Sequence, residues 1–509
     1  MRQLTISSER YRNPVLGRIL LLPLLCILAA APLSARPSRL PDLADSSEGV
    51  LTPRAEQQMG EQTMRKVHAS GAYFNDPEVN AYLDSLGQRL IAADPQIGGK
   101  FEFFAVPSAE INAFALPGGY IGVNTGLMIA AESEGELASV LAHEISHVTQ
   151  RHIARSVEGQ SDPRLSLLTA VAAAVIAARS GNPQVASAAM TSIAAAQQQS
   201  QIDSTRENEL EADRLAFQLL DKAGFDQHAM AEFFMHLGRM ERIHDSQVPG
   251  YLRDHPLTSE RISGAQDRAH GKPYRQVEDS LDFHLTRALL RSYEGEPENA
   301  VTRFKSELDE GRYRHRAAAR YGYAAALLRG KDYPEALKQV AALERAGLRH
   351  PMLESLAAIA LRQSGQNEAA RQRYRAALAR YPNQLQLIYD YPRTLIADRQ
   401  YEEAARFVEA QLNRRRNDAT LHQLAAEANG GLGRNLKLHY HQGELYAAQG
   451  NAGAAAEQFD LAVRANDGSF QDLLVVENRL REIRQDMGAL GQPGNGRKEP
   501  PQKSLVPHH

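Results

Sequence analysis

The chain has 509 residues, too many for one ordinary domain, so about two or three domains are expected. Hydrophobic residues make up 43% of the sequence, and the formal net charge of -3 is close to balanced. This balance gives no electrostatic reason to expect nucleic acid as a partner. Aromatic residues account for only 6%, Trp is absent, and Ala, Leu and Arg are abundant, which favours helices over strands.

The first 35 residues have the pattern of a cleaved signal peptide. A basic segment precedes the apolar run Ile19–Ala31, and the small residues Ser34 and Ala35 follow, where a signal peptidase can cut. The run of 13 residues is short for a membrane span, which needs roughly 20; an uncleaved anchor is the alternative. Cys26, the only cysteine, lies inside this segment, so a mature chain would suit an oxidising compartment. We therefore expect export.

A strand-rich segment follows within an otherwise helical region. Phe101–Val106 and Ile111–Leu116 have strand patterns, Pro117–Gly119 indicates a turn, and Tyr120–Val123 resumes extended structure. The pattern predicts a small antiparallel sheet. The polar segment 132–136 then opens a predicted helix that carries apolar residues on one side.

That helix contains His143, Glu144 and His147. Two histidines four residues apart project from the same face of a helix, which suits two ligands of one zinc ion. Glu144 lies beside them, where it can take a proton from a metal-bound water and pass it to the leaving amine. The motif predicts a catalytic site with one zinc ion per chain.

A catalytic zinc ion usually takes three protein ligands, so one more is needed. His152 does not have the spacing of a compact third ligand, and we interpret it as a surface residue or as a contact of a ligand. Glu209 and Asp213 lie four apart in a helical segment, where Glu209 can bind zinc and Asp213 can accept a ring N–H from a ligating histidine. A solvated acidic helix face is the alternative.

The segment 158–201 separates the two halves of this predicted zinc site. It contains an apolar run of 14 residues, Leu165–Ala178, which is too short to span a bilayer. We expect a mobile lid over the cleft that could rest on a membrane surface through residues 165–178. A buried helix of an ordinary insertion is the alternative.

The region 280–485 repeats a short phrase. Similar segments begin at Gly295, Gly330, Gly365 and Arg399, spaced by 34 or 35 residues, and Gly450 begins another out of phase. A small turn residue before an Ala-centred helix at this period is typical of tetratricopeptide repeats, which stack into an α-solenoid with a groove for peptides or partner proteins. A generic helical bundle is the alternative. Residues 488–509 have little to bury, which predicts a disordered tail.

The motif at His143, Glu144 and His147, followed by Glu209 and Asp213, resembles the Ste24/HtpX-like zinc metallopeptidases, and among them the periplasmic members with tetratricopeptide repeats. The resemblance covers roughly residues 50–270 in specific motifs. It implies a mostly α chain with a zincin-like α+β metallopeptidase domain over 36–275, gluzincin-type zinc ligation and a periplasmic location. It makes Glu209 the third ligand and Asp213 a residue that supports the ligands.

The same resemblance implies roles for two further segments. Asn112, Ala113 and Phe114 match an edge strand that pairs with an extended substrate backbone above the zinc ion. His255 would stabilise the oxyanion or occupy the open zinc position as a reversible plug. Arg261 would assist with transition-state charge.

The sequence therefore predicts an endopeptidase that cuts extended or misfolded envelope proteins. By resemblance, its clients would be outer-membrane β-barrel proteins stalled during assembly, recruited or docked on an assembly machine through the repeat groove. Chaperone assistance to the same clients is compatible with this architecture. The alternatives are a non-proteolytic holdase or scaffold with a vestigial zinc site, and a zinc hydrolase for a non-peptide envelope substrate. Glu144 argues against the holdase or scaffold, because a vestigial or structural site has no use for a general base. The edge strand argues against a non-peptide substrate, because strand addition recognises a peptide main chain.

Overall fold

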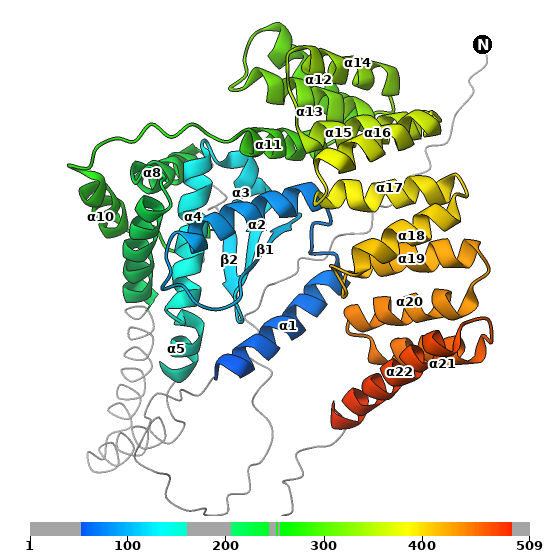
Figure 1. Cartoon of the computed structure of the whole chain (residues 1–509). Helices are drawn as coiled ribbons and strands as arrows, with labels where there is room; N and C mark the ends of the chain where they lie inside the picture. Colours follow the sequence, from blue (N-terminus) through cyan, green and yellow to red (C-terminus); the bar gives the residue numbers. More distant parts are fainter. Residues whose placement is uncertain (1–51, 160–204, 244–250, 253–254, 491–509) are drawn as a thin grey trace, which may run out of the picture. The chain divides into compact units, whose positions relative to one another are not determined.

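The computed structural model describes residues 52–159, 205–243, 251–252 and 255–490 (Figure 1). Most of these residues are helical, and three short strands form one sheet among them. None of the described helices is both long enough and apolar enough to cross a membrane. The predicted signal peptide (1–35) lies outside the described residues, as do almost all of the predicted lid (158–201) and tail (488–509). These three segments stay predictions.

The sheet and the helices around it are formed by residues before 270. Prolines occupy the first position of the first two helices. A backbone N–H at this position has no acceptor within the helix, so proline costs no hydrogen bond there. Residues 205–222 are helical as well. The elements are α1 (Pro53–Ser70), α2 (Pro77–Ala92), β1 (Glu102–Val106), β2 (Ala113–Leu116), β3 (Tyr120–Asn124), α3 (Thr125–Ala130), α4 (Glu134–Thr149), α5 (His152–Gly159), α8 (His228–Ile243) and α10 (Ser259–Ala269).

The strands lie in the order β1-β3-β2. The predicted hairpin is confirmed, because β2 and β3 pair antiparallel across the turn at Gly118 and Gly119, whose φ angles are 80° and 85°. The sheet is mixed, however, and not wholly antiparallel as predicted: β1 runs parallel to β3 on its other side. Gly122 lies between the rings of Phe104 and Phe114, and a β-carbon there would lie 2.5 Å from the Phe114 ring. This close packing explains the glycine inside β3.

Helix α4 is the predicted helix that carries the catalytic motif. Its N-cap is Ser133, whose hydroxyl oxygen accepts a hydrogen bond of 3.1 Å from the Glu136 backbone N–H. Leu137, Val140 and Leu141 are the predicted apolar residues on one side of this helix, and they are buried in the main core. The helix contacts β2, β3, α2 and α8. Packing on both sides therefore fixes the position of the motif.

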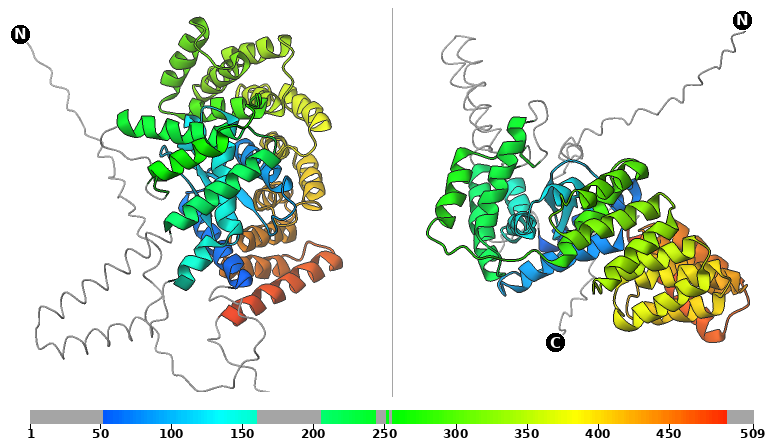
Figure 2. Two further views of the ribbon diagram at one scale, coloured as in Figure 1. Left: turned by 90° about the vertical axis from the view of Figure 1, so that its left-hand side faces the viewer. Right: turned by 90° about the horizontal axis from the view of Figure 1, so that it is seen from above.

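The predicted repeats form successive helices that pack against their neighbours in chain order (Figures 1 and 2). The turns at the repeated phrase share one feature, a residue with left-handed backbone: Gly365 has a φ of 80°, and Arg399 takes the same place with a φ of 57°. The helices are α11 (Leu281–Tyr293), α12 (Pro297–Asp309), α13 (Arg316–Arg329), α14 (Tyr333–Arg345), α15 (Pro351–Gln363), α16 (Asn367–Arg380), α17 (Leu385–Ala397), α18 (Tyr401–Leu412), α19 (Ala419–Gly431), α20 (Asn435–Ala448), α21 (Ala452–Arg464) and α22 (Phe470–Leu490).

The first repeat helices share a hydrophobic core with the helices around the sheet. Buried residues of α2 and α4 belong to the same cluster as Phe283 of α11 and Tyr321 of α13. Polar contacts join the same elements, because the Ser280 hydroxyl donates to Glu134 at 2.6 Å and the Glu134 N–H donates to Asp279 at 2.7 Å. The start of the repeat region is thus tied to the start of the motif helix.

Candidate active site

Helix α4 places the three residues of the predicted catalytic motif together. His143 and Glu144 are each 1% exposed, and His147 is largely buried. Because the two histidines are four residues apart, their rings project from the same face of the helix, and their Nε2 atoms lie 2.9 Å apart. Two ring nitrogens this close must share a proton or bind a common cation.

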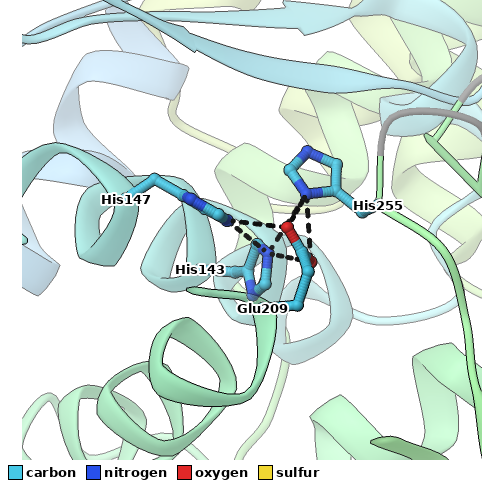
Figure 3. Close-up of side chains that lie close together, drawn as sticks. All are labelled: His143, His147, Glu209 and His255. Atoms are coloured by element: carbon cyan, nitrogen blue, oxygen red, sulfur yellow. Dashed lines mark hydrogen bonds and ion pairs between the residues drawn. The ribbon is translucent and has the colours of Figure 1, made fainter. Parts of the chain in front are cut away.

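The helical residues 205–222 bring Glu209 to the same point. Its Oε2 atom lies 3.3 Å from Nε2 of His143, and its Oε1 atom lies 3.3 Å from Nε2 of His147. The carboxylate therefore faces both rings at once (Figure 3). The structure brings together the three residues that the sequence analysis predicted as zinc ligands.

His255 approaches this group from the chain segment that precedes α10. Its Nδ1 atom lies 3.0 Å from Oε1 of Glu209 and 3.4 Å from Nε2 of His143 (Figure 3). Its other ring nitrogen, Nε2, lies 3.4 Å from Oε1 of Glu144. The ring of His255 therefore lies between the side chains of His143 and Glu209 on one side and the carboxylate of Glu144 on the other.

The four side chains have the chemistry of a metal site. One ligand atom from each of His143, His147, Glu209 and His255 lies within 4.8 Å of all the others. Imidazole nitrogens with one carboxylate are the ligands of catalytic zinc in other proteins. In this buried cluster, three imidazole rings and one carboxylate point toward a common centre. This arrangement is suited to binding a cation.

The carboxylates set the charge of this cluster. Burial lowers the pKa of His143, but contacts with Asp213 and Glu209 outweigh burial and raise it to about 9. Burial raises the pKa of Glu209, but hydrogen bonds with His143, His147 and His255 outweigh this and hold it well below its usual value. The negative charge at this point thus favours a cation, which is either a proton on His143 or a metal ion.

Asp213 and Arg261 contact the cluster of His143 and Glu209. Oδ1 of Asp213 lies 3.0 Å from Nδ1 of His143, the ring nitrogen that faces away from Glu209. Arg261 donates to Asp213 through Nε and Nη2, both at 2.8 Å, and its Nη1 atom lies 2.8 Å from Oε2 of Glu209. Nη1 also donates to the Pro256 carbonyl oxygen at 3.1 Å. The guanidinium therefore contacts two carboxylates, those of Asp213 and Glu209.

The predicted substrate strand is β2, together with Asn112 just before it. Ala113 and Phe114 pair with β3, and within the described residues β2 pairs with no other strand. The carbonyl oxygen of Ile111 accepts a hydrogen bond of 2.8 Å from the backbone N–H of Tyr251. This bond ties the start of the edge strand to the segment that carries His255.

Two further residues pack against the histidines of the site: Tyr251, which the sequence analysis missed, and His152, which it interpreted as a surface residue or as a contact of a ligand. Tyr251 is 1% exposed, and its ring stacks on His255 with centroids 4.8 Å apart. The His255 N–H also donates to the Tyr251 carbonyl oxygen at 2.8 Å. His152 is buried and touches His147, with their Nδ1 atoms 2.8 Å apart. The contact of His152 with His147 could not be predicted from spacing, because it depends on the break between α4 and α5 at Arg151. Tyr251 and His255 are four residues apart and joined by a helical backbone bond, but neither belongs to the motif that carries Glu144.

The fold and the site define a metallopeptidase with tetratricopeptide repeats. Residues 77–269 match the model of peptidase family M48, and residues 361–428 match a tetratricopeptide repeat model. The chain is 34% identical over 450 residues to the beta-barrel assembly-enhancing protease of Escherichia coli, covering 88% of this chain and 91% of that protein. It is 38% identical over 299 residues to the Yersinia pestis protein of the same name, covering 58% and 61%.

A more distant relative is metalloprotease LoiP of Escherichia coli, 28% identical over 169 residues, which covers 31% of this chain and 59% of that protein. The chain belongs to the family of beta-barrel assembly-enhancing proteases, within the M48 metallopeptidases. The predicted resemblance, the mostly α fold class with its repeats, and the enzyme class are thereby confirmed.

Proposed function

We propose that this metallopeptidase is a zinc-dependent endopeptidase in which His143, His147 and Glu209 hold one zinc ion. The observation that carries the proposal is the convergence of these three side chains beside the buried carboxylate of Glu144. When bound, zinc would polarise the scissile carbonyl and lower the pKa of a bound water toward about 7. The donor set supports zinc over calcium or magnesium, which prefer oxygen ligands.

Glu144 is the general base in this proposal. It follows His143 directly on α4, so its carboxylate is fixed next to the ligand group without being part of it. A carboxylate in this place can take a proton from the attacking water and deliver it to the nitrogen of the leaving amine. A vestigial or structural site would have no use for this buried acid, so its presence favours catalysis over a scaffold role.

In this proposal, the ring of His255 blocks the open zinc position until substrate binds. The ring nitrogen Nδ1 lies among the three ligand residues, 3.0 Å from Glu209, which supports the plug role over the oxyanion role. In this state the ring would fill the fourth zinc position and exclude water. Its neighbour Tyr251 holds the ring by stacking and is tied to the edge strand through Ile111. Substrate pairing with the strand could therefore move the ring out of the site.

Asp213 and Arg261 position the ligands. Asp213 would accept the Nδ1–H of His143 and so fix the tautomer that presents Nε2 to zinc. Arg261 is 1% exposed, and its nitrogens face Asp213, Glu209 and a backbone carbonyl, which supports a positioning role in place of the predicted role in transition-state charge.

The substrate is an extended polypeptide segment. Asn112, Ala113 and Phe114 at and before β2 would pair with its main chain, because β2 has a strand on one side only within the described part of the chain. The repeats would bind a second part of the same polypeptide, away from the metal site. A cavity of 930 Å³ is lined by residues of the repeat helices α17, α19 and α20 and by residues of α1, of α2 and of the segment between them. Its side-chain amides, which include Asn417, Gln423 and Asn451, can both donate to and accept from a peptide backbone.

We further propose that the enzyme works in the periplasm after cleavage of the signal peptide, on misfolded or misassembled envelope proteins. Relatives named for enhancing β-barrel assembly support outer-membrane β-barrel proteins as clients and their assembly machinery as a partner of the repeats. Chaperone assistance to the same clients is compatible with this arrangement. The predicted lid lies almost wholly outside the described residues, and its contact with a membrane surface through residues 165–178 stays a prediction.

The test is cleavage of an unfolded β-barrel protein by the purified chain, before and after removal of the metal with a chelator. We expect cleavage that is lost on chelation and restored by zinc, with little cleavage of the same barrel once it is folded in detergent. Protection of the unfolded barrel from aggregation without cleavage would favour the non-proteolytic holdase. Retention of full cleavage in the chelated protein would exclude the metal mechanism.

A further inference from the structure

His152 occupies a position that the catalytic motif does not explain. It begins α5, five residues after His147, and it is 4% exposed. In one continuous helix, residues five apart project in directions about 140° apart, so their rings would not meet. Here α4 ends at Thr149, and Arg151 has a left-handed φ of 52°. The turn returns the ring of His152 to His147, and their Nδ1 atoms lie 2.8 Å apart.

An ion pair with α1 holds this turn. Nε and Nη2 of Arg151 donate to Oε1 of Glu56 at 3.0 and 2.6 Å. A left-handed backbone at a residue other than glycine costs about 1 kcal/mol or more, so it persists only where surrounding contacts fix it. The contact between the two rings is therefore a built feature of the fold.

The other nitrogen of His152 faces a carboxylate. Its Nε2 atom lies 3.2 Å from Oε2 of Glu211, and Nη2 of Arg155 donates to the same oxygen at 2.8 Å. Glu211 lies two residues after Glu209 on the helical segment 205–222. The contacts thus run from His147 through His152 back to the segment that supplies the acidic ligand.

The proton positions along this path are linked. A histidine that binds zinc through Nε2 carries its proton on Nδ1. Nε2 of His147 faces Glu209, so its Nδ1 is the donor and Nδ1 of His152 is the acceptor. The proton of His152 then lies on Nε2, where the carboxylate of Glu211 accepts it. One arrangement of protons satisfies all three side chains and leaves Nε2 of His147 free for the metal.

We propose that His152 and Glu211 position His147 for zinc by fixing its tautomer and ring orientation. This inference rests on the zinc binding proposed above. The two ligating histidines then have different supports: Asp213 lies directly at Nδ1 of His143, at 3.0 Å, whereas a neutral ring stands between His147 and its carboxylate. Loss of such outer contacts typically weakens metal affinity by about 10- to 100-fold.

The test measures the zinc affinity of the purified chain by competition with a chelator. His152→Leu removes the acceptor and keeps an apolar volume, and it should weaken zinc binding by about 10- to 100-fold. His152→Asn keeps an acceptor close to the Nδ1 position, and it should recover most of this loss. Glu211→Ala should weaken binding by about 10-fold. Glu207→Ala, an exposed change on the same helix, is the matched control and should bind zinc like the wild type.

Wild-type zinc affinity in His152→Leu and Glu211→Ala would overturn the inference, and so would equal losses in His152→Leu and His152→Asn. If His152→Leu does not fold, the comparison of Glu211→Ala with its control Glu207→Ala still tests the inference. The Glu211 side chain is 30% exposed, so its loss leaves the core intact. A wild-type chain that binds no zinc would overturn the proposed function as well. Tight binding by the wild type and all variants alike would overturn this inference alone.

Discussion

Arg261 and Asp213 form a buried pair joined by two hydrogen bonds of 2.8 Å, and neither residue is more than 1% exposed. The same guanidinium also reaches Glu209 at 2.8 Å, so one positive charge offsets two carboxylates behind the candidate metal centre. Burial raises the pKa of Asp213, but Arg261 and His143 outweigh burial and lower it. The pair keeps Asp213 ionised and oriented toward His143.

Replacing Arg261 with Leu should therefore destabilise the protein strongly, because two buried carboxylates lose the guanidinium that they share. Breaking a buried ion pair by removing one member costs about 3 to 5 kcal/mol of unfolding free energy. The loss can be measured by urea unfolding of the metal-free chain, followed by circular dichroism. Arg206→Leu is the control, since its ion pair with Glu260 is exposed and 3.6 Å long, and it should cost no more than about 1 kcal/mol. Equal losses in the two variants would contradict the account.

Replacing His255 with Ala should speed cleavage of an unfolded substrate, because the ring no longer competes for the open zinc position. The rate should be compared at a zinc concentration that saturates both proteins. His270→Ala, an exposed change at the end of α10, should leave the rate unchanged. A slower His255→Ala enzyme with normal zinc content would assign His255 to oxyanion stabilisation and remove the plug.

The repeat region should lose stability in mild acid through His441. Burial, followed by the charges of His422 and Lys437, lowers the pKa of His441 to about 3. The unfolded ring takes up a proton near pH 6.5, so between pH 6.5 and 3 the unfolded state binds more protons and stability falls as the pH falls. At pH 5 the cost is about 2 kcal/mol.

The shift in melting temperature between pH 7.5 and pH 5 checks this prediction. His441→Asn should show a smaller shift than the wild type, whatever its stability at pH 7.5. His439→Asn, a substitution on the same helix, should keep the wild-type shift. The same shift in melting temperature in the wild type and in both variants would show that a group other than His441 causes the loss of stability.

The local features of this molecule were readable from the sequence. The spacing of His143 and His147 places both rings on one helical face, and the repeated phrase at Gly330 and Gly365 sets the turns of the repeats. The parallel pairing of β1 was missed because strand patterns carry no information on direction. The contacts of Arg261 could not be predicted either, since they join residues 48 positions apart in sequence.

His152 shows most clearly where pattern reasoning ends. Its spacing of five from His147 excludes a shared helical face, and only the left-handed turn at Arg151 restores the contact. The ion pair that holds this turn comes from Glu56, on a distant helix. The sequence pattern therefore predicts the residues of the catalytic motif. The residues that hold them in position, such as His152, are set by tertiary contacts that the pattern does not show.

Catalysis at the zinc site is tested by the cleavage of an unfolded β-barrel protein by the wild-type chain and by Glu144→Gln, each with its zinc content measured. The substitution keeps the shape of the side chain and removes the base, so we expect normal zinc binding and a loss of kcat of at least about 100-fold. Cleavage at the wild-type rate by a zinc-loaded Glu144→Gln protein would contradict the assignment of Glu144 as the general base and of this site as the centre of catalysis.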